Sequence, residues 1–264
     1  MQSPDQAYAA MQAGDESAGL RFYRLLADAT LFLLLEREAE GERVDPRVFD
    51  LPDGPVLLAY DSEERLAVFG QGPQTGSGLP YAALPGRLIA QQMLGQGLSL
   101  GLNFGTGAAS EVLLPPEALR WLCEMLEVAP IEVEATPAQF FAPKGLPGPL
   151  SDALTFTLGG AAGLAQAALL AGVRYSDGRL GHMLAVIDAR PGAEEALARA
   201  LSEALVFSGL EAGELDVAFL ASSDVAVAEL ARVAVVFEVP ELVVQAAVER
   251  AAPGMDAAKP PRLR

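Results

Sequence analysis

The stretch AGVRYSDGRLGHMLAVID, residues 171–188, carries the strongest local fold signal in this sequence. Two apolar runs, Val173–Tyr175 and Leu180–Ile187, lie on either side of the dipeptide Asp177-Gly178. Glycine readily adopts the positive φ that a primed two-residue turn requires. Asp-Gly between two strand-like runs therefore predicts a β-hairpin in the second half of the chain.

Outward from this hairpin, the second half alternates between strand and helix patterns. The predicted elements are, in chain order, a strand at 154–158, a helix at 164–170, the hairpin, a helix at 191–207 and a strand at 215–220. The order strand, helix, strand, strand, helix, strand is that of the split βαβ or ferredoxin-like fold. A short helix, a further strand at 233–238 and a helix after Pro240 extend the pattern.

The first half also mixes helices and strands. Ser3-Pro4 is typical of a helix start, because serine caps the free backbone N–H groups and proline suits the first helical position. The further predicted elements are a helix at 17–27, a strand at 30–36, a hairpin of 56–60 with 65–69, a helix at 85–94, strands at 98–103 and 112–114, and a helix from Pro115-Pro116 to about 127. The predicted fold class is α+β, with two mixed α/β domains, the second ferredoxin-like.

A proline-rich segment separates the two halves. Residues 130–149 contain five prolines, which remove backbone donors and disfavour helix. We therefore predict a domain at 1–128, a linker at 129–151, a second domain at 152–252 and a disordered tail at 253–264. Phe140 and Phe141 are expected to dock on a domain surface, and limited proteolysis is expected to cut first near Lys144.

Composition restricts the class of protein. The chain has 264 residues, of which 51% are hydrophobic, so it can bury a sizeable core and is not disordered throughout. Its net charge of −17, from 35 acidic and 18 basic residues, would repel phosphate backbones and anionic membranes. We expect an acidic protein that binds neither nucleic acid nor membranes.

Cysteine usage and apolar runs bear on the compartment. Cys123 is the single cysteine, so no intramolecular disulfide can form, which suits a reducing cytoplasm. Residues 1–15 lack the basic and apolar regions of a signal peptide. The apolar run Leu31–Leu35 is too short to span a bilayer. The predicted localisation is cytoplasmic.

Several blocks resemble the SseB (enhanced serine sensitivity) family. GLSLGLN at 97–103, followed by FGTG, is similar to the strand-to-loop Leu-Asn-Pro-Gly-type signature of its N-terminal domain, and YAALPGRLIAQQML from Tyr81 and VLLPPEALRWL from Val112 fit that domain too. Residues 171–188 and FSGLEAGELDVAFL from Phe207 resemble its C-terminal domain. The resemblance extends roughly over residues 19–239. It implies a bacterial protein without established enzymatic activity and with a link to serine tolerance.

Two departures from the family pattern stand out. Phe104 occupies a position where proline is common, and Phe69-Gly70-Gln71-Gly72 replaces a Phe-Thr-Ser type step. The glycine-rich stretch Gly70–Gly78 is expected to be a mobile loop. Whether Phe104 and this loop alter a family role is left open by the sequence.

Residues that could carry chemistry are few. Gly97-Leu98-Ser99-Leu100-Gly101 is a G-x-S-x-G motif, but Ser99 is predicted to open a strand, whereas an esterase serine sits on a turn that leads into a helix. His182 is the only histidine, so it would have to be the base, and with Cys123 it cannot build a zinc site. None of the G-x-G sequences continues to a nucleotide-binding fingerprint. No catalytic, cofactor-binding or metal-binding residue and no cofactor is predicted.

The function predicted from sequence is that of a non-enzymatic protein which acts through a protein or metabolite partner. The alternatives are a hydrolase that uses Ser99 and an amino-acid-sensing binder. The latter would have a pocket at the domain junction near Phe140 and Phe141. The identity of the partner and the oligomeric state are left open.

Overall fold

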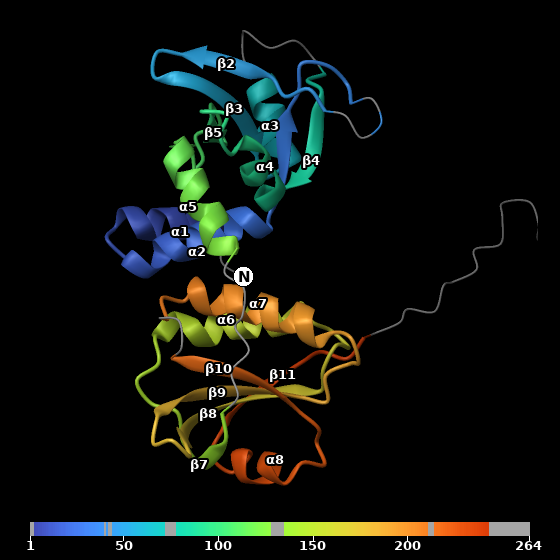
Figure 1. Ribbon diagram of the computed structural model, residues 1–264. Coiled ribbons are helices and arrows are strands. Elements are labelled where there is room, and N and C mark those ends of the chain that lie inside the picture. Colours follow the sequence, from blue (N-terminus) through green and yellow to red (C-terminus); the bar gives the residue numbers. More distant parts are fainter. Residues whose placement is uncertain are drawn as a thin grey trace, which may run out of the picture.

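The computed structural model describes residues 3–39, 41, 44–71, 78–127, 135–210 and 214–242. Two lobes are stacked along the long axis of the molecule, each with its own sheet (Figure 1). Helices of both lobes face one another in the middle, and the sheets lie outside them. The predicted α+β class with two sheet regions is confirmed.

The first sheet is mixed. Its strands are β1 (Thr30–Leu34), β2 (Val48–Leu51), β3 (Gly54–Tyr60), β4 (Tyr81–Pro85), β5 (Ser99–Leu102) and β6 (Val112–Leu114). The order is β4-β1-β3-β5-β6, with β2 also paired to β3. Strands β3 and β5 are parallel, whereas the other pairs are antiparallel.

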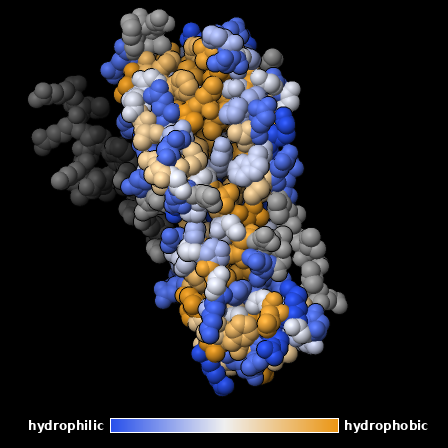
Figure 2. Space-filling model, turned by 90° about the vertical axis from the view of Figure 1, so that its left-hand side faces the viewer, coloured by the Kyte–Doolittle hydropathy of each residue, from blue (hydrophilic) through white to orange (hydrophobic). Residues whose placement is uncertain are grey.

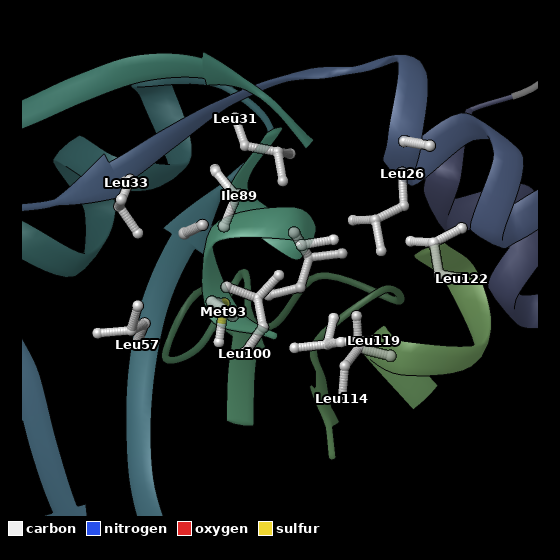
Figure 3. Close-up of a cluster of buried hydrophobic side chains, with 14 of the residues drawn as sticks. Leu26, Leu31, Leu33, Leu57, Ile89, Met93, Leu100, Leu114, Leu119 and Leu122 are labelled. Atoms are coloured by element: carbon white, nitrogen blue, oxygen red, sulfur yellow. The ribbon is translucent and has the colours of Figure 1, made fainter. Parts of the chain in front are cut away.

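Five helices belong to the first lobe: α1 (Pro4–Gln12), α2 (Glu16–Asp28), α3 (Glu63–Gly70), α4 (Gly86–Met93) and α5 (Pro116–Leu126). The predicted start of α1 is confirmed, because Ser3 and Gln6 form a reciprocal capping box. Helices α2, α4 and α5 cover one face of the sheet. Figure 3 shows Leu31 and Leu100 of the strands near Ile89 of α4, with Leu57 of β3 and Leu122 of α5 at opposite sides of the same core.

The predicted strand at 65–69 is wrong, because these residues lie in α3. The Ser62 hydroxyl accepts from the backbone N–H of Arg65, and two glutamates occupy the first turn, where negative charge is favourable. Leu66 and Phe69, three residues apart, pack on the face of the sheet opposite α2, α4 and α5. The helical spacing of Leu66 and Phe69 and the Ser62 cap favour a helix more strongly than the short apolar run favours a strand.

The second sheet consists of β7 (Pro137–Phe141), β8 (Ala167–Tyr175), β9 (Leu180–Ile187), β10 (Leu215–Leu220) and β11 (Val235–Glu238). Its order is β10-β9-β8-β11, with β7 also paired to β8. Helices α6 (Gly148–Gly159) and α7 (Glu194–Val206) cover one face, and α8 (Val225–Leu230) lies on the other. The predicted hairpin is confirmed as β8–β9, and Gly178 in its turn has φ 89°.

The topology of this sheet is not ferredoxin-like. Strand β10 pairs in parallel directly with β9, to which α7 connects it, so the βαβ unit is not split. The predicted strand at 154–158 is helix α6, and most of the predicted helix at 164–170 is the start of β8. Leu154, Phe156 and Leu158 alternate like a strand, but Leu150, Leu154 and Leu158 form one buried helical face, and Phe156 is 43% exposed.

Strand β7 lies inside the predicted linker, 129–151, and helix α6 begins there. Phe140 packs between the clusters on the α8 side of the sheet, and the ring of Phe141 lies over Gly172, where an added Cβ would be 2.1 Å from Cε2. Both phenylalanines therefore dock on the second sheet. The division into two independently folded domains stays a prediction.

Three predicted features lie outside the described residues: most of the loop 70–78, the helix after Pro240 and the tail 253–264. In the part of the chain that the structure describes, no helix combines the length and the apolar character needed to cross a membrane.

Candidate functional site

A cleft of about 840 Å³ lies where the two lobes meet, between α2 and α4 of the first lobe and α6 and α7 of the second. We call it the junction cleft. Its lining combines charged side chains, two threonines, the ring of Phe156 and a set of glycines and alanines from α6, α7 and the residue Gly192.

Helix periodicity places the charged side chains on this cleft. On α2, Arg24 and Asp28 are four residues apart, while Phe22 and Leu26 point into the first core. On α7, Glu195, Arg199 and Glu203 repeat every four residues along the cleft, whereas Leu197 and Leu201 are buried in the second core. Each helix therefore presents a polar face to the junction.

Arg87 on α4 connects the two lobes. Its Nη1 and Nη2 lie 3.3 and 3.2 Å from the two carboxylate oxygens of Glu203 on α7, and Nη2 also bonds Asp28 on α2. Burial acts to lower the pKa of Arg87, but the hydrogen bonds to Glu203 and Asp28 outweigh it, so the pKa is raised. This guanidinium is well neutralised.

Arg24 is placed differently. Its Nη2 donates to Oγ1 of Thr157 on α6, its Nε is 3.7 Å from Asp28, and its guanidinium lies 5.6 Å from the centre of the Phe156 ring. Its Nη1 is buried and has no hydrogen-bond partner among the described residues. Burial lowers the pKa of Arg24, and the nearby carboxylates of Asp28 and Glu203 do not fully compensate.

Phe207, the residue after α7, packs into the first lobe. It is 2% exposed and belongs to the same hydrophobic cluster as Phe22 and Leu26 of α2. A residue from the second half of the sequence thus completes the core of the first lobe and packs the end of α7 against that lobe.

The structure does not bring the candidate hydrolase residues together. Ser99 opens β5 in the first sheet and is 9% exposed, and the next three residues continue the strand. His182 lies on β9 of the second sheet, with Nε2 3.0 Å from the backbone oxygen of Lys144. Cys123 is buried on α5, where burial raises the pKa of its thiol and so disfavours the reactive thiolate.

The signature loop after β5 is held by its own side chains. Asn103 has φ 56° and is buried, its amide donates to Ser110, and its side-chain oxygen accepts from the backbone of Asp61. The backbone N–H groups of Gly105 and Gly107 both donate to the carboxylate of Glu111, at 3.1 and 2.9 Å. These two backbone amides therefore bond within the loop and are not available to an external anion.

Phe104, at the position where proline is common in the SseB pattern, has a packing role. An added Cβ at Gly101 would lie 3.0 Å from Cδ2 of Phe104, and the backbone oxygen of Phe104 accepts from the Tyr60 hydroxyl. The side chain joins the aromatic cluster on the outer face of the first sheet.

The pocket predicted near Phe140 and Phe141 is misplaced. Both residues lie on β7, whereas the junction cleft is lined by Phe156 of α6. The predictions from sequence do not include Arg24, Arg87 and Glu203 as candidate site residues. The four-residue spacing of charged residues at 24–28 and 195–203 indicates charged helix faces and is the signal that could have pointed to them. Within the described residues, no group of histidine, cysteine or carboxylate side chains could hold a metal ion.

A family model matches most of the first lobe. Residues 5–121 match the family model of the SseB protein N-terminal domain, a range that is less than half of the chain and runs from α1 into α5. No curated protein and no solved structure matches the chain. The cleft residues of α2 and α4 lie within the matched range, whereas those of α6 and α7 lie beyond it.

Proposed function

We propose that this protein, whose first lobe is similar to the SseB N-terminal domain, is a non-enzymatic binding protein. Its junction cleft binds a small zwitterionic metabolite, which carries both an anionic and a cationic group. Amino acids are the simplest class of such molecules. The link to serine tolerance that the family resemblance implies makes L-serine the first compound to test.

The balance of charge in the cleft carries this proposal. Three arginines and three carboxylates line it, although the chain as a whole has 18 basic and 35 acidic residues. Such a lining can form ion pairs with both ends of a zwitterionic molecule, whereas the carboxylates and the negative field of the protein would repel a polyanion. The exposed ring of Phe156 and the glycines and alanines leave room for a short apolar body.

The hydrolase alternative has weaker support. The residues that line the junction cleft include hydroxyls of two threonines but no histidine or cysteine. Acyl transfer needs a nucleophile within hydrogen-bond reach of a base. Ser99 and His182 lie in separate sheets, so they do not supply that pair.

Amino acids are expected to stabilise the protein against heat. A ligand at a hundredfold excess over its Kd adds about 2.7 kcal/mol to the free energy of unfolding, which raises Tm by roughly 5 °C for a chain of this size. The measurement is a thermal-shift screen of the twenty amino acids, followed by calorimetric titration of those that raise Tm. A flat response to all twenty would contradict the proposal.

Replacing Ser99 by alanine is expected to leave both fold and function intact. The side chain is buried in a strand, so the change removes one hydroxyl from a packed position and should alter the free energy of unfolding by less than about 1 kcal/mol. Thermal unfolding and the amino-acid titration check this. Loss of function in a fully folded Ser99→Ala protein would favour the hydrolase.

A protein partner is a second candidate, favoured by the apolar surface. Figure 2 shows hydrophobic side chains gathered in a band along one side of the molecule, bordered by hydrophilic ones. Large exposed apolar side chains of the first lobe include Val48, Leu51 and Leu113. Affinity capture from the native cell, read by mass spectrometry, would identify such a partner.

A further inference from the structure

We propose that Arg24 is the receptor for the carboxylate of the ligand in the junction cleft. This inference rests on the proposed function, and it names which end of a zwitterionic ligand enters the inner part of the cleft. The cationic end then faces the more exposed part of the cleft, where Glu195 lies on α7.

The first support is the unused bonding capacity of Arg24. Its side chain is 14% exposed, and Nη1 is fully buried without a hydrogen-bond partner among the described residues. Leaving a charged donor buried and unpaired is costly, and native proteins rarely do so without a reason. A carboxylate that bonds Nη1 would remove this cost, and the planar guanidinium suits a two-oxygen acceptor.

The second support is that the neighbouring carboxylates are already engaged. Glu203 and one oxygen of Asp28 bond Arg87, and Arg24 keeps only a 3.7 Å approach to the other oxygen of Asp28. The inner cleft therefore holds one well-paired guanidinium and one poorly paired guanidinium. The two guanidinium groups and the two carboxylates already balance in charge, so an incoming carboxylate would be held by the Nη1 donor of Arg24, which is unpaired among the described residues, and not by an excess of positive charge.

The α6 residues fix the position of Arg24 and do not compete for its free donor. Thr157 Oγ1 accepts from Nη2 and donates to the backbone oxygen of Ala153 at 2.9 Å, so it orients the guanidinium. The ring of Phe156 is 43% exposed, its centre lies 5.6 Å from the guanidinium, and both side chains line the cleft. Because Nη1 is fully buried, a ligand in the cleft reaches it after a shift of the Phe156 ring or of the Arg24 side chain.

The outer part of the cleft suits the opposite charge. Glu195 on α7 has a side chain that is 91% exposed, and its nearest cationic atom, in Arg199, is 3.9 Å away. This carboxylate is free enough to accept hydrogen bonds from an ammonium group.

The test compares amino acids with their carboxamides, which keep the amino group and the side chain but lose the negative charge. Calorimetric titration of the full chain is expected to give carboxamides a Kd at least about tenfold weaker than that of the parent acids. Arg24→Met should weaken the acids by a similar factor and abolish the preference over the amides. Arg24→Lys should keep a reduced preference, since it keeps the charge but loses the planar fork.

Arg21→Met is the matched control. Arg21 lies one turn earlier on α2, also has a buried unpaired nitrogen, and is paired with Asp15 away from the residues that line the cleft. This variant should bind acids as the parent protein does. Thermal unfolding of each variant, followed by the fluorescence of Trp121, verifies that it is folded.

The outcomes separate the two proposals. If no amino acid binds the parent protein, the proposed function fails, and this inference with it. If acids and amides bind equally well, or if Arg24→Met keeps the preference for acids, the role of Arg24 is overturned while the binding function stands. Equal weakening by Arg21→Met and Arg24→Met would also overturn it.

Discussion

Replacing Phe207 by alanine is expected to lower the free energy of unfolding of the first lobe by about 3–5 kcal/mol. Phe207 follows α7 of the second lobe, yet it is 2% exposed within the core formed by α2, α4 and α5. Truncation would leave a cavity in that core and free the end of α7. Urea unfolding followed by the fluorescence of Trp121, the single tryptophan, measures the effect, because Trp121 lies on α5 and contacts Tyr23 of α2.

Phe156→Ala is the matched control for this change. Its ring is 43% exposed, so truncation should cost less than about 1 kcal/mol. Equal destabilisation by the two variants would show that Phe207 does not complete the first core. Proteolysis near Lys144 adds a second measurement: fragments that stay together in gel filtration for the parent protein, but separate for Phe207→Ala, would identify Phe207 as the connection between the lobes.

Part of the fold can be predicted because it depends on residues that are close together in the sequence. The Asp177-Gly178 turn and the Ser3-Pro4 helix start depend on residues within one turn of each other, so the sequence displays them directly. The predictions for residues 154–158 and 164–170 are wrong, because the spacing of their apolar residues fits both a helix and a strand. Residues Ala168–Ala171 are buried on both faces of the second sheet, so no alternation marks them as a strand.

The candidate site was less accessible to sequence reasoning. Each helix shows its own charged face, and the pairing of Glu195 with Arg199 can be read from their spacing. Which faces meet, however, depends on how the lobes dock. Arg87 and Glu203 are 116 residues apart in sequence, and Arg24 and Thr157 are 133 apart. Contacts of this kind form only when the two lobes pack together, and the burial of Phe207 is part of that packing.

Replacing Gly86 by alanine is expected to destabilise the protein by about 3 kcal/mol, because it forces α4 away from α2. Gly86 is the first residue of α4, and a Cβ there would lie 1.9 Å from the backbone oxygen of Leu26 and 3.3 Å from Cδ1 of Leu31. A backbone oxygen inside α2 cannot move aside without moving the helix. The clash is therefore relieved only by separating the two helices.

Gly148→Ala is the control for this prediction, since Gly148 is the first residue of α6 and an added Cβ would meet nothing within 4 Å. Urea unfolding of both variants gives the difference in stability. Because Arg87 follows Gly86 and bonds Asp28 of α2, the shift should also disturb the cleft and weaken amino-acid binding in calorimetry. A Gly86→Ala protein as stable as Gly148→Ala would show that Gly86 of α4 is not held against the backbone of α2. The pairing of Arg87 with Asp28 could not then depend on a close approach of these two helices.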